Sequence, residues 1–189
     1  SFLSINSKLS NNFLDSLTEE EVCSILCSSL DQLSSIGSMS IQAEAFDISF
    51  DVSVFVSDNR LPTEKYLHRI LKYTGIEKST LILAFIILDK VTTQSPLIIT
   101  TETKLKFLAS AVICAIKYNE DLAFGDHHYA EILGISLSTL TQIETSFLEL
   151  IDYSVYVSME TWVLYLENIF EIQTTDDCDE EQEKEAFSL

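Results

Sequence analysis

Two stretches of this chain are apolar on nearly every side, at residues 81–88 and 107–116. A helix that is apolar around its whole circumference is stable only when other elements enclose it. Both stretches are too short for a membrane span, which needs about 18 consecutive apolar residues. Only 4 of the 189 residues are glycine and 2 are proline, so few residues interrupt helices. We therefore predict an all-α fold with two enclosed central helices, from about residue 81 to 91 and from about 103 to 118.

An amphipathic helix is predicted before these two. Thr18 and Glu21 have the spacing of a capping box, and the apolar residues that follow repeat at helical intervals until Gly37. The period then changes, because apolar and polar residues alternate from 46 to 56. Alternation with a period of two is typical of extended chain, so this segment is predicted to be extended, as a strand or a linker.

Residues that favour helix starts and helix ends predict further helices in the rest of the chain. A helix is predicted to open at Pro62 and to end at Gly75, and another to run from Asp126 as its N-cap to Gly134. Ser136 is the predicted N-cap of the next helix. A last helix is expected over residues 158–170, followed by a run of acidic residues at 173–189 that is typical of a solvated, disordered tail.

Charge and cysteine content exclude several classes of function. The net charge of −19 opposes binding to nucleic acid or to an anionic membrane, since both carry negative phosphates. The four cysteines show neither disulfide-framework spacing nor a CxxC pair; they are Cys23, Cys27, Cys114 and Cys178. We expect no metal and no cofactor, and an intracellular location, cytoplasmic or nuclear or both, because no export signal is visible.

Catalytic motifs are absent from the sequence apart from Asp126-His127-His128, which resembles the signature of the DHH phosphoesterases. That family needs a preceding strand and further metal-binding aspartates. Here the string opens a short helix between helices, so Asp126 is interpreted as a helix cap and the chain as a non-enzyme.

Glu144 is the most informative residue. It lies on an apolar stripe formed by Leu137, Leu140, Phe147 and Ile151, where a lone carboxylate is costly to bury. It should therefore meet a cation or emerge at an interface, and Lys117, 27 residues earlier, is the nearest candidate. The spacing leaves open whether such a pair would be structural or functional.

An ordered series of short strings resembles the cyclin box of the P/U-type cyclins. The series comprises Pro62, Tyr66-Leu67-His68-Arg69-Ile70, Tyr73, Ala84, Leu88-Asp89-Lys90, Ala115-Ile116-Lys117-Tyr118, Tyr129-Ala130, Gly134-Ile135-Ser136, Glu144 and Phe147-Leu148. The resemblance covers about residues 53 to 170. It implies a five-helix cyclin box with an extra N-terminal helix and a C-terminal helix.

The resemblance also implies a division of the chain. Residues 1–17 would be an N-terminal segment, 18–61 an amphipathic helix and extended linker, 62–157 the cyclin box core, 158–172 the C-terminal helix and 173–189 the acidic tail.

The resemblance assigns roles to individual residues. It implies that Lys117 and Glu144 hold the regulatory helix of a cyclin-dependent kinase, with apolar contacts from Tyr118, Leu148, Tyr153 and Val155. Arg69 and Asp89 are expected to form an internal pair that links the first two box helices.

The expected function is that of a cyclin that binds and activates such a kinase, and a monomer is expected when the kinase is absent. Two alternatives remain. One is a helical interaction scaffold with a cyclin-like fold and no kinase activation. The other is the use of this fold in transcription factors, which bind DNA; the acidic charge opposes it.

Overall fold

The computed structural model describes residues 14–41, 51–58, 61–94, 98–169 and 171. Within these ranges the regular structure is helical, which confirms the predicted all-α class. In chain order the elements are α2 (Glu19–Ile41), the 3-10 helix η1 (Val52–Phe55), α3 (Thr63–Thr74), α4 (Lys78–Gln94), α5 (Lys104–Asn119), α6 (Asp126–Leu133) and α7 (Leu137–Leu150). Residues 159–169 form a further helix.

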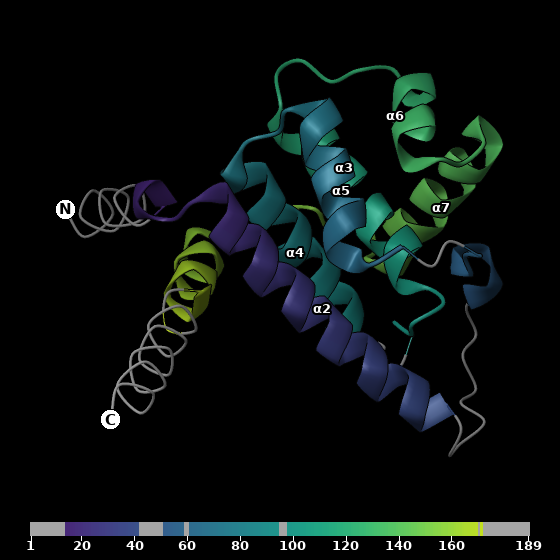
Figure 1. Ribbon diagram of the computed structural model, residues 1–189, viewed down its shortest axis with the longest axis horizontal. Coiled ribbons are helices and arrows are strands. Elements are labelled where there is room, and N and C mark those ends of the chain that lie inside the picture. The colour runs from purple at the N-terminus through teal and green to yellow at the C-terminus, as the bar shows by residue number, and fades with distance from the viewer. Residues whose placement is uncertain (1–13, 42–50, 59–60, 95–97, 170, 172–189) are drawn as a thin grey trace, which may run out of the picture.

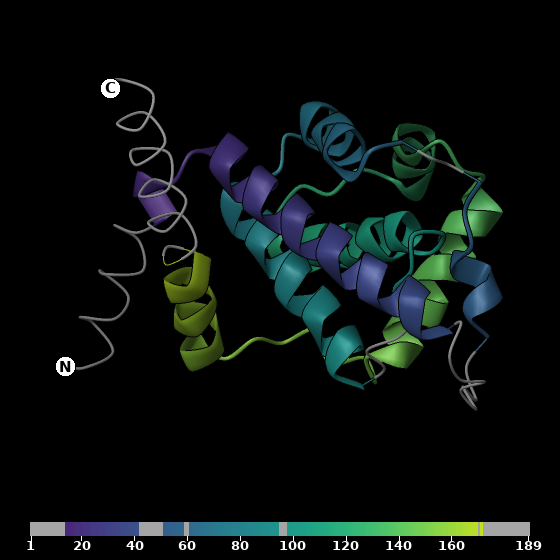
Figure 2. The same ribbon diagram turned by 60° about the horizontal axis from the view of Figure 1, so that its bottom comes forward.

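The two apolar stretches form the centre of the molecule, as predicted. Side chains 81–88 on α4 and 107–116 on α5 are all buried, and these two helices pack against each other. Helix α2 crosses α3 and α4 on one side, while α6 and α7 lie on the other (Figures 1 and 2). In the parts of the chain that the structure describes, no helix is both long and apolar enough to cross a membrane.

The N-terminal helix begins where the sequence predicts and ends later. Thr18 and Glu21 form the capping box, with the Glu21 carboxylate 2.7 Å from the Thr18 amide and the Thr18 hydroxyl 3.2 Å from the Glu21 amide. Gly37 is not the end, because α2 continues to Ile41. The Ser38 hydroxyl bonds the Ser34 carbonyl at 2.8 Å and accepts from the Thr101 amide at 3.0 Å, and these contacts hold the last turns against the segment before α5.

Glycines end two helices in the manner predicted. Gly75 after α3 and Gly134 after α6 have φ values of 62° and 71°, a left-handed conformation that glycine adopts at little cost. Ser136 caps α7, with its hydroxyl accepting from the Thr139 amide at 3.0 Å. Asp126 is not the N-cap of α6. Gly125 has that place, and Asp126 is the first helical residue.

The extended prediction for residues 46–56 is wrong over its described part. Residues 46–50 lie outside the described residues, and Val52–Phe55 form the 3-10 helix η1. The Asp51 carboxylate accepts from the Ser53 amide at 3.0 Å and so caps this turn. Phe55 is fully buried and stacks on Phe107 with ring centroids 4.0 Å apart. Phe55 is the fully buried residue of this segment, and Val52 and Val54 pack partly buried against the core beside it.

Candidate functional site

The predicted pair of Lys117 and Glu144 forms, and a third residue joins it. The Lys117 ammonium at the end of α5 donates to both oxygens of Glu144 on α7, at 2.7 and 2.9 Å. It also lies 2.7 Å from Asp126 at the start of α6. The side chains of Lys117, Glu144 and Asp126 are 33%, 15% and 43% exposed. One cation thus connects the end of α5, the start of α6 and the middle of α7 at the surface.

This arrangement explains how a carboxylate is tolerated on the apolar stripe of α7. Leu140, Phe147 and Ile151 are buried, whereas Glu144 lies at the margin of the core and keeps some access to water. A buried carboxylate without a partner would cost several kcal/mol, and the two-oxygen contact with Lys117 removes most of that cost. Glu144 is therefore held in one orientation while part of its side chain stays accessible.

The pKa of Lys117 reflects two opposing effects. Partial burial lowers the pKa, but the hydrogen bonds and negative charges of Asp126 and Glu144 outweigh burial and raise it above its ordinary value. The ammonium is accordingly charged at neutral pH. With one positive and two negative charges, the cluster carries a net negative charge, which favours partners that offer hydrogen-bond donors.

Cys114 lies one turn before Lys117 and provides a pH prediction. Burial raises the pKa of this thiol from 9.0 to about 12, and the Glu144 charge adds to the rise while Lys117 opposes it. Its folded-state pKa is raised, so the thiol contributes stability below about pH 9 that is lost as the pH rises toward 12.

At about pH 8.5 we expect iodoacetamide to leave Cys114 unmodified in the native protein and to modify it in urea, as measured by mass spectrometry. Equal labelling rates in the two states would contradict this.

The apolar residues expected to surround the cluster lie after Lys117 on α5 and on the second half of α7 and the turn that follows it. Tyr118 follows Lys117 and is 54% exposed, and Leu148 is partly buried one turn after Glu144. The Tyr153 amide donates to the Leu148 carbonyl at 2.8 Å, and the Val155 amide to the Tyr153 carbonyl at 3.2 Å. These bonds fix the path of the turn that follows α7.

The turn after α7 holds Tyr153 outward by an unusual backbone conformation that the sequence did not predict. Asp152 and Tyr153 have φ values of 51° and 54°, which are uncommon for residues other than glycine. Such conformations persist only where surrounding contacts stabilise them, and they are concentrated at functional sites. The result is a tyrosine side chain that is 63% exposed.

Lys90 is a positioning residue that sequence reasoning missed. Its ammonium donates to the carbonyls of Ser154 and Tyr156, at 2.8 and 2.7 Å. Partial burial lowers its pKa. Lys90 thereby ties α4 to the loop that carries Tyr153 and Val155. The sequence shows only a lysine after Asp89, and no local pattern indicates which loop it would reach.

The predicted pair of Arg69 and Asp89 is wrong. The Arg69 guanidinium donates to the Glu131 carbonyl at 3.2 Å, near the C-terminal end of α6, where a cation is favoured by the helix dipole. Asp89 accepts from the Thr92 hydroxyl at 2.8 Å and from the Tyr165 hydroxyl. Arg69 thus faces α6, whereas Asp89 faces the C-terminal helix, and each stabilises a different helix contact.

The Asp126-His127-His128 string does not form a common site. Asp126 contacts Lys117, His127 lies 3.4 Å from Glu131, and His128 packs on Phe124 with ring centroids 4.4 Å apart. Among the described residues, no group of three or more His, Cys, Asp or Glu side chains is placed to hold a metal ion.

Comparison with known proteins identifies the family. The cyclin family model matches residues 17–155, which is most of the chain, so the chain belongs to the cyclin family. Helices α3 to α7 are the five helices of its cyclin box, with α2 before them and the helix at 159–169 after them.

The curated relatives are plant cyclins of the U and P types. The chain is 31% identical over 117 residues to Cyclin-U4-1 of Arabidopsis thaliana, covering 60% of this chain and 58% of that protein. It is 28% identical over 118 residues to Cyclin-P3-1 of Oryza sativa subsp. japonica, covering 61% of this chain and 50% of that protein. The chain thus spans between half and three fifths of the length of these relatives. Within the family it is a P/U-type cyclin.

Proposed function

We propose that this chain is the regulatory subunit of a cyclin-dependent protein kinase, which it binds and activates. The observation that carries the proposal is the placement of Glu144, a carboxylate held by Lys117 at the edge of the core and next to exposed apolar side chains. A purely structural pair has no need of such surroundings. The cyclin family in general supports a kinase partner.

The proposed kinase-binding surface offers both apolar contacts and charged hydrogen-bonding groups, which a stable interface requires. Tyr118 and Tyr153 are large, exposed and amphipathic, which is the composition of interface anchors. Glu144 and Lys117 can accept and donate charge-assisted hydrogen bonds with the partner's backbone, and these fix the orientation of the two proteins. Burial of apolar surface between the two proteins would supply most of the affinity. The ionic cluster would fix their relative orientation.

Activation would follow from selective binding of one kinase conformation. A kinase is active when the glutamate of its regulatory helix pairs with the lysine that orients ATP. A cyclin that binds the inward position of that helix more tightly than the outward position shifts the equilibrium toward the active form. The chain itself would perform no catalysis in this mechanism.

Co-expression with individual cyclin-dependent kinases tests the proposal. The tagged chain is expected to capture at least one kinase, and the purified complex should phosphorylate a generic peptide at least tenfold faster than that kinase alone. Capture without any rise in rate would favour the scaffold function and reject activation. Failure to capture any kinase in the set would reject kinase binding as well.

A further inference from the structure

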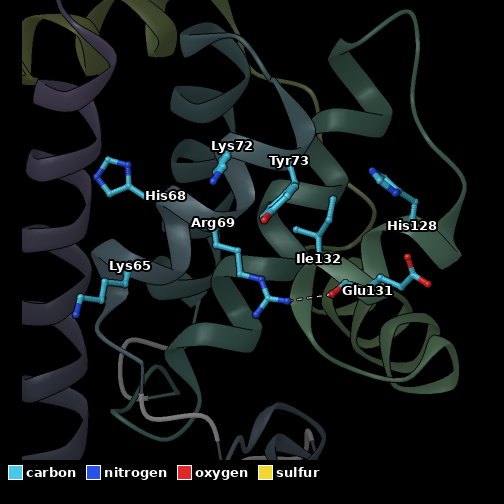
Figure 3. Close-up of a pocket in the computed structure, with 8 residues that line it drawn as sticks. All are labelled: Lys65, His68, Arg69, Lys72, Tyr73, His128, Glu131 and Ile132. Atoms are coloured by element: carbon cyan, nitrogen blue, oxygen red, sulfur yellow. Dashed lines mark hydrogen bonds between the residues drawn. The ribbon is translucent and has the colours of Figure 1, made fainter.

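A basic pocket lies between α3 and α6, away from the Lys117 cluster. Its volume is about 560 Å³. Figure 3 shows Tyr73 and Ile132 in the middle, Arg69 and Lys72 on one side and His128 on the other. Lys117, Glu144 and Asp126 are not among the residues that line this pocket, so it is a separate feature of the surface.

The charge of this pocket is opposite to that of the chain. Lys65, Arg69 and Lys72 contribute three of the 11 lysines and arginines of a protein whose net charge is −19. They are spaced by four and three residues, so they occupy one face of α3, and like charges at this spacing repel one another. In the described parts of the chain, none of the three forms an ion pair. An anion bound between them would relieve this repulsion.

Glu131 lines the pocket, but neither its carboxylate nor that of the nearby Glu64 forms an ion pair with these three cations. Glu64 lies 3.8 Å from His68, and Glu131 lies 3.4 Å from His127. Arg69 uses one of its five N–H donors on the Glu131 carbonyl, a contact that fixes the guanidinium at the pocket wall. Lys72 lies over the Tyr73 ring, 5.5 Å from its centroid. Both cations are therefore oriented while they still have donors to offer.

An unsatisfied polar atom provides independent support for a ligand. The Nε2 atom of His128 is buried and has no hydrogen-bond partner. Leaving a buried polar atom unpaired is costly, so native structures almost always supply a partner. The ring is held in place by packing on Phe124. His128 lines the pocket, and a small turn of its ring would bring this nitrogen, in the tautomer that carries a proton there, to a ligand oxygen.

We propose that this pocket binds a phosphorylated serine or threonine within a peptide of another protein. A phosphate group brings close to two negative charges and three acceptor oxygens, which matches Arg69, Lys72 and the buried nitrogen of His128. Tyr73 and Ile132 offer an apolar floor for a neighbouring side chain of the peptide. The acidic remainder of the chain disfavours nucleic acid and anionic membranes, because these present many phosphates at once.

The test uses the isolated 189-residue chain, so it does not depend on kinase binding. A fluorescent pool of short peptides with a fixed phosphothreonine and random flanks is titrated and followed by fluorescence polarisation. The unphosphorylated pool, inorganic phosphate and phosphoinositide-containing vesicles are measured in parallel. Arg69→Gln and Lys72→Gln are the test variants. Lys184→Gln removes the same charge in the acidic C-terminal stretch and is the matched control.

We expect saturable binding of the phosphorylated pool and at least about tenfold weaker binding by each test variant, with Lys184→Gln unchanged. NMR signals of the His128 ring should shift on titration of the pool. Equal binding of the unphosphorylated pool, or binding unaffected by Arg69→Gln and Lys72→Gln, would overturn the proposal. Inorganic phosphate binding as tightly as the peptides would overturn the peptide assignment, and binding to vesicles alone would identify a lipid headgroup as the ligand instead.

Discussion

Replacing Glu144 or Lys117 by alanine is expected to abolish kinase capture while leaving the fold intact. Each truncation removes charge-assisted hydrogen bonds at the centre of the proposed interface. Lys117→Ala leaves the Glu144 carboxylate without its cation, whereas Glu144→Ala leaves Lys117 paired with Asp126 alone. We expect a loss of about 2–4 kcal/mol of binding free energy, which weakens binding by roughly 30-fold to 1,000-fold. Surface plasmon resonance with the purified kinase measures the change in Kd.

A matched control variant shows whether the loss of binding depends on the position of Glu144 or only on the loss of one negative charge. Glu149→Ala removes the same charge from an exposed position on the same helix and should leave Kd unchanged within about twofold. Glu144→Gln preserves the shape of the side chain and should have an intermediate effect. Thermal unfolding identifies any variant that has lost its structure. Unchanged binding in both Glu144→Ala and Lys117→Ala, with the fold intact, would reject the assigned roles.

Phe107→Ala is expected to destabilise the protein by about 3–5 kcal/mol. Phe107 is fully buried on α5, stacks on Phe55 of η1 at 4.0 Å and lies 6.4 Å from the Phe147 ring of α7. Its removal leaves a cavity where three elements meet, and the surrounding helices can collapse only partly. Urea unfolding followed by circular dichroism measures the free energy of unfolding.

Phe107→Ala should also disturb the candidate site, because Phe107 packs between α5, which carries Lys117, and α7, which carries Glu144. We expect weaker kinase binding together with the lost stability. Phe124→Ala is the control, since Phe124 is 52% exposed and its truncation should cost less than about 1 kcal/mol. A loss below about 1 kcal/mol for Phe107→Ala would contradict the central position assigned to this ring.

The helices of the core were the most predictable part of the fold. Burial of residues 81–88 and 107–116 follows from their composition, because no partly exposed helix can be apolar on every side. Caps were predictable where a single residue satisfies the end of a helix, as at Ser136 and Gly75. The extended prediction for residues 46–56 was wrong in its described part, since local alternation does not reveal that a 3-10 turn would place Phe55 in the core.

The candidate site was partly predictable. Glu144 was evident because a carboxylate interrupts an apolar stripe, and Lys117 was the nearest cation in sequence. Asp126 and Lys90 were not predicted as parts of the site, because their contacts with Lys117 and with the Ser154 carbonyl join segments distant in sequence and leave no periodic signal. The prediction of an Arg69–Asp89 pair failed for the same reason. The family pattern identifies both residues, but it does not show that Arg69 faces α6 and Asp89 faces the C-terminal helix.

By itself, the sequence determined that this chain is helical, which two helices are central, and that one carboxylate required a cation or a partner. These properties depend on the order of polar and apolar residues along a single helix, and helix geometry converts that order into faces. Only the tertiary structure decided that Lys117 connects three helices, that Tyr153 is held outward, and that a basic pocket forms beside α6. Those features depend on side chains that are distant in sequence, and their meeting is set by how the helices pack.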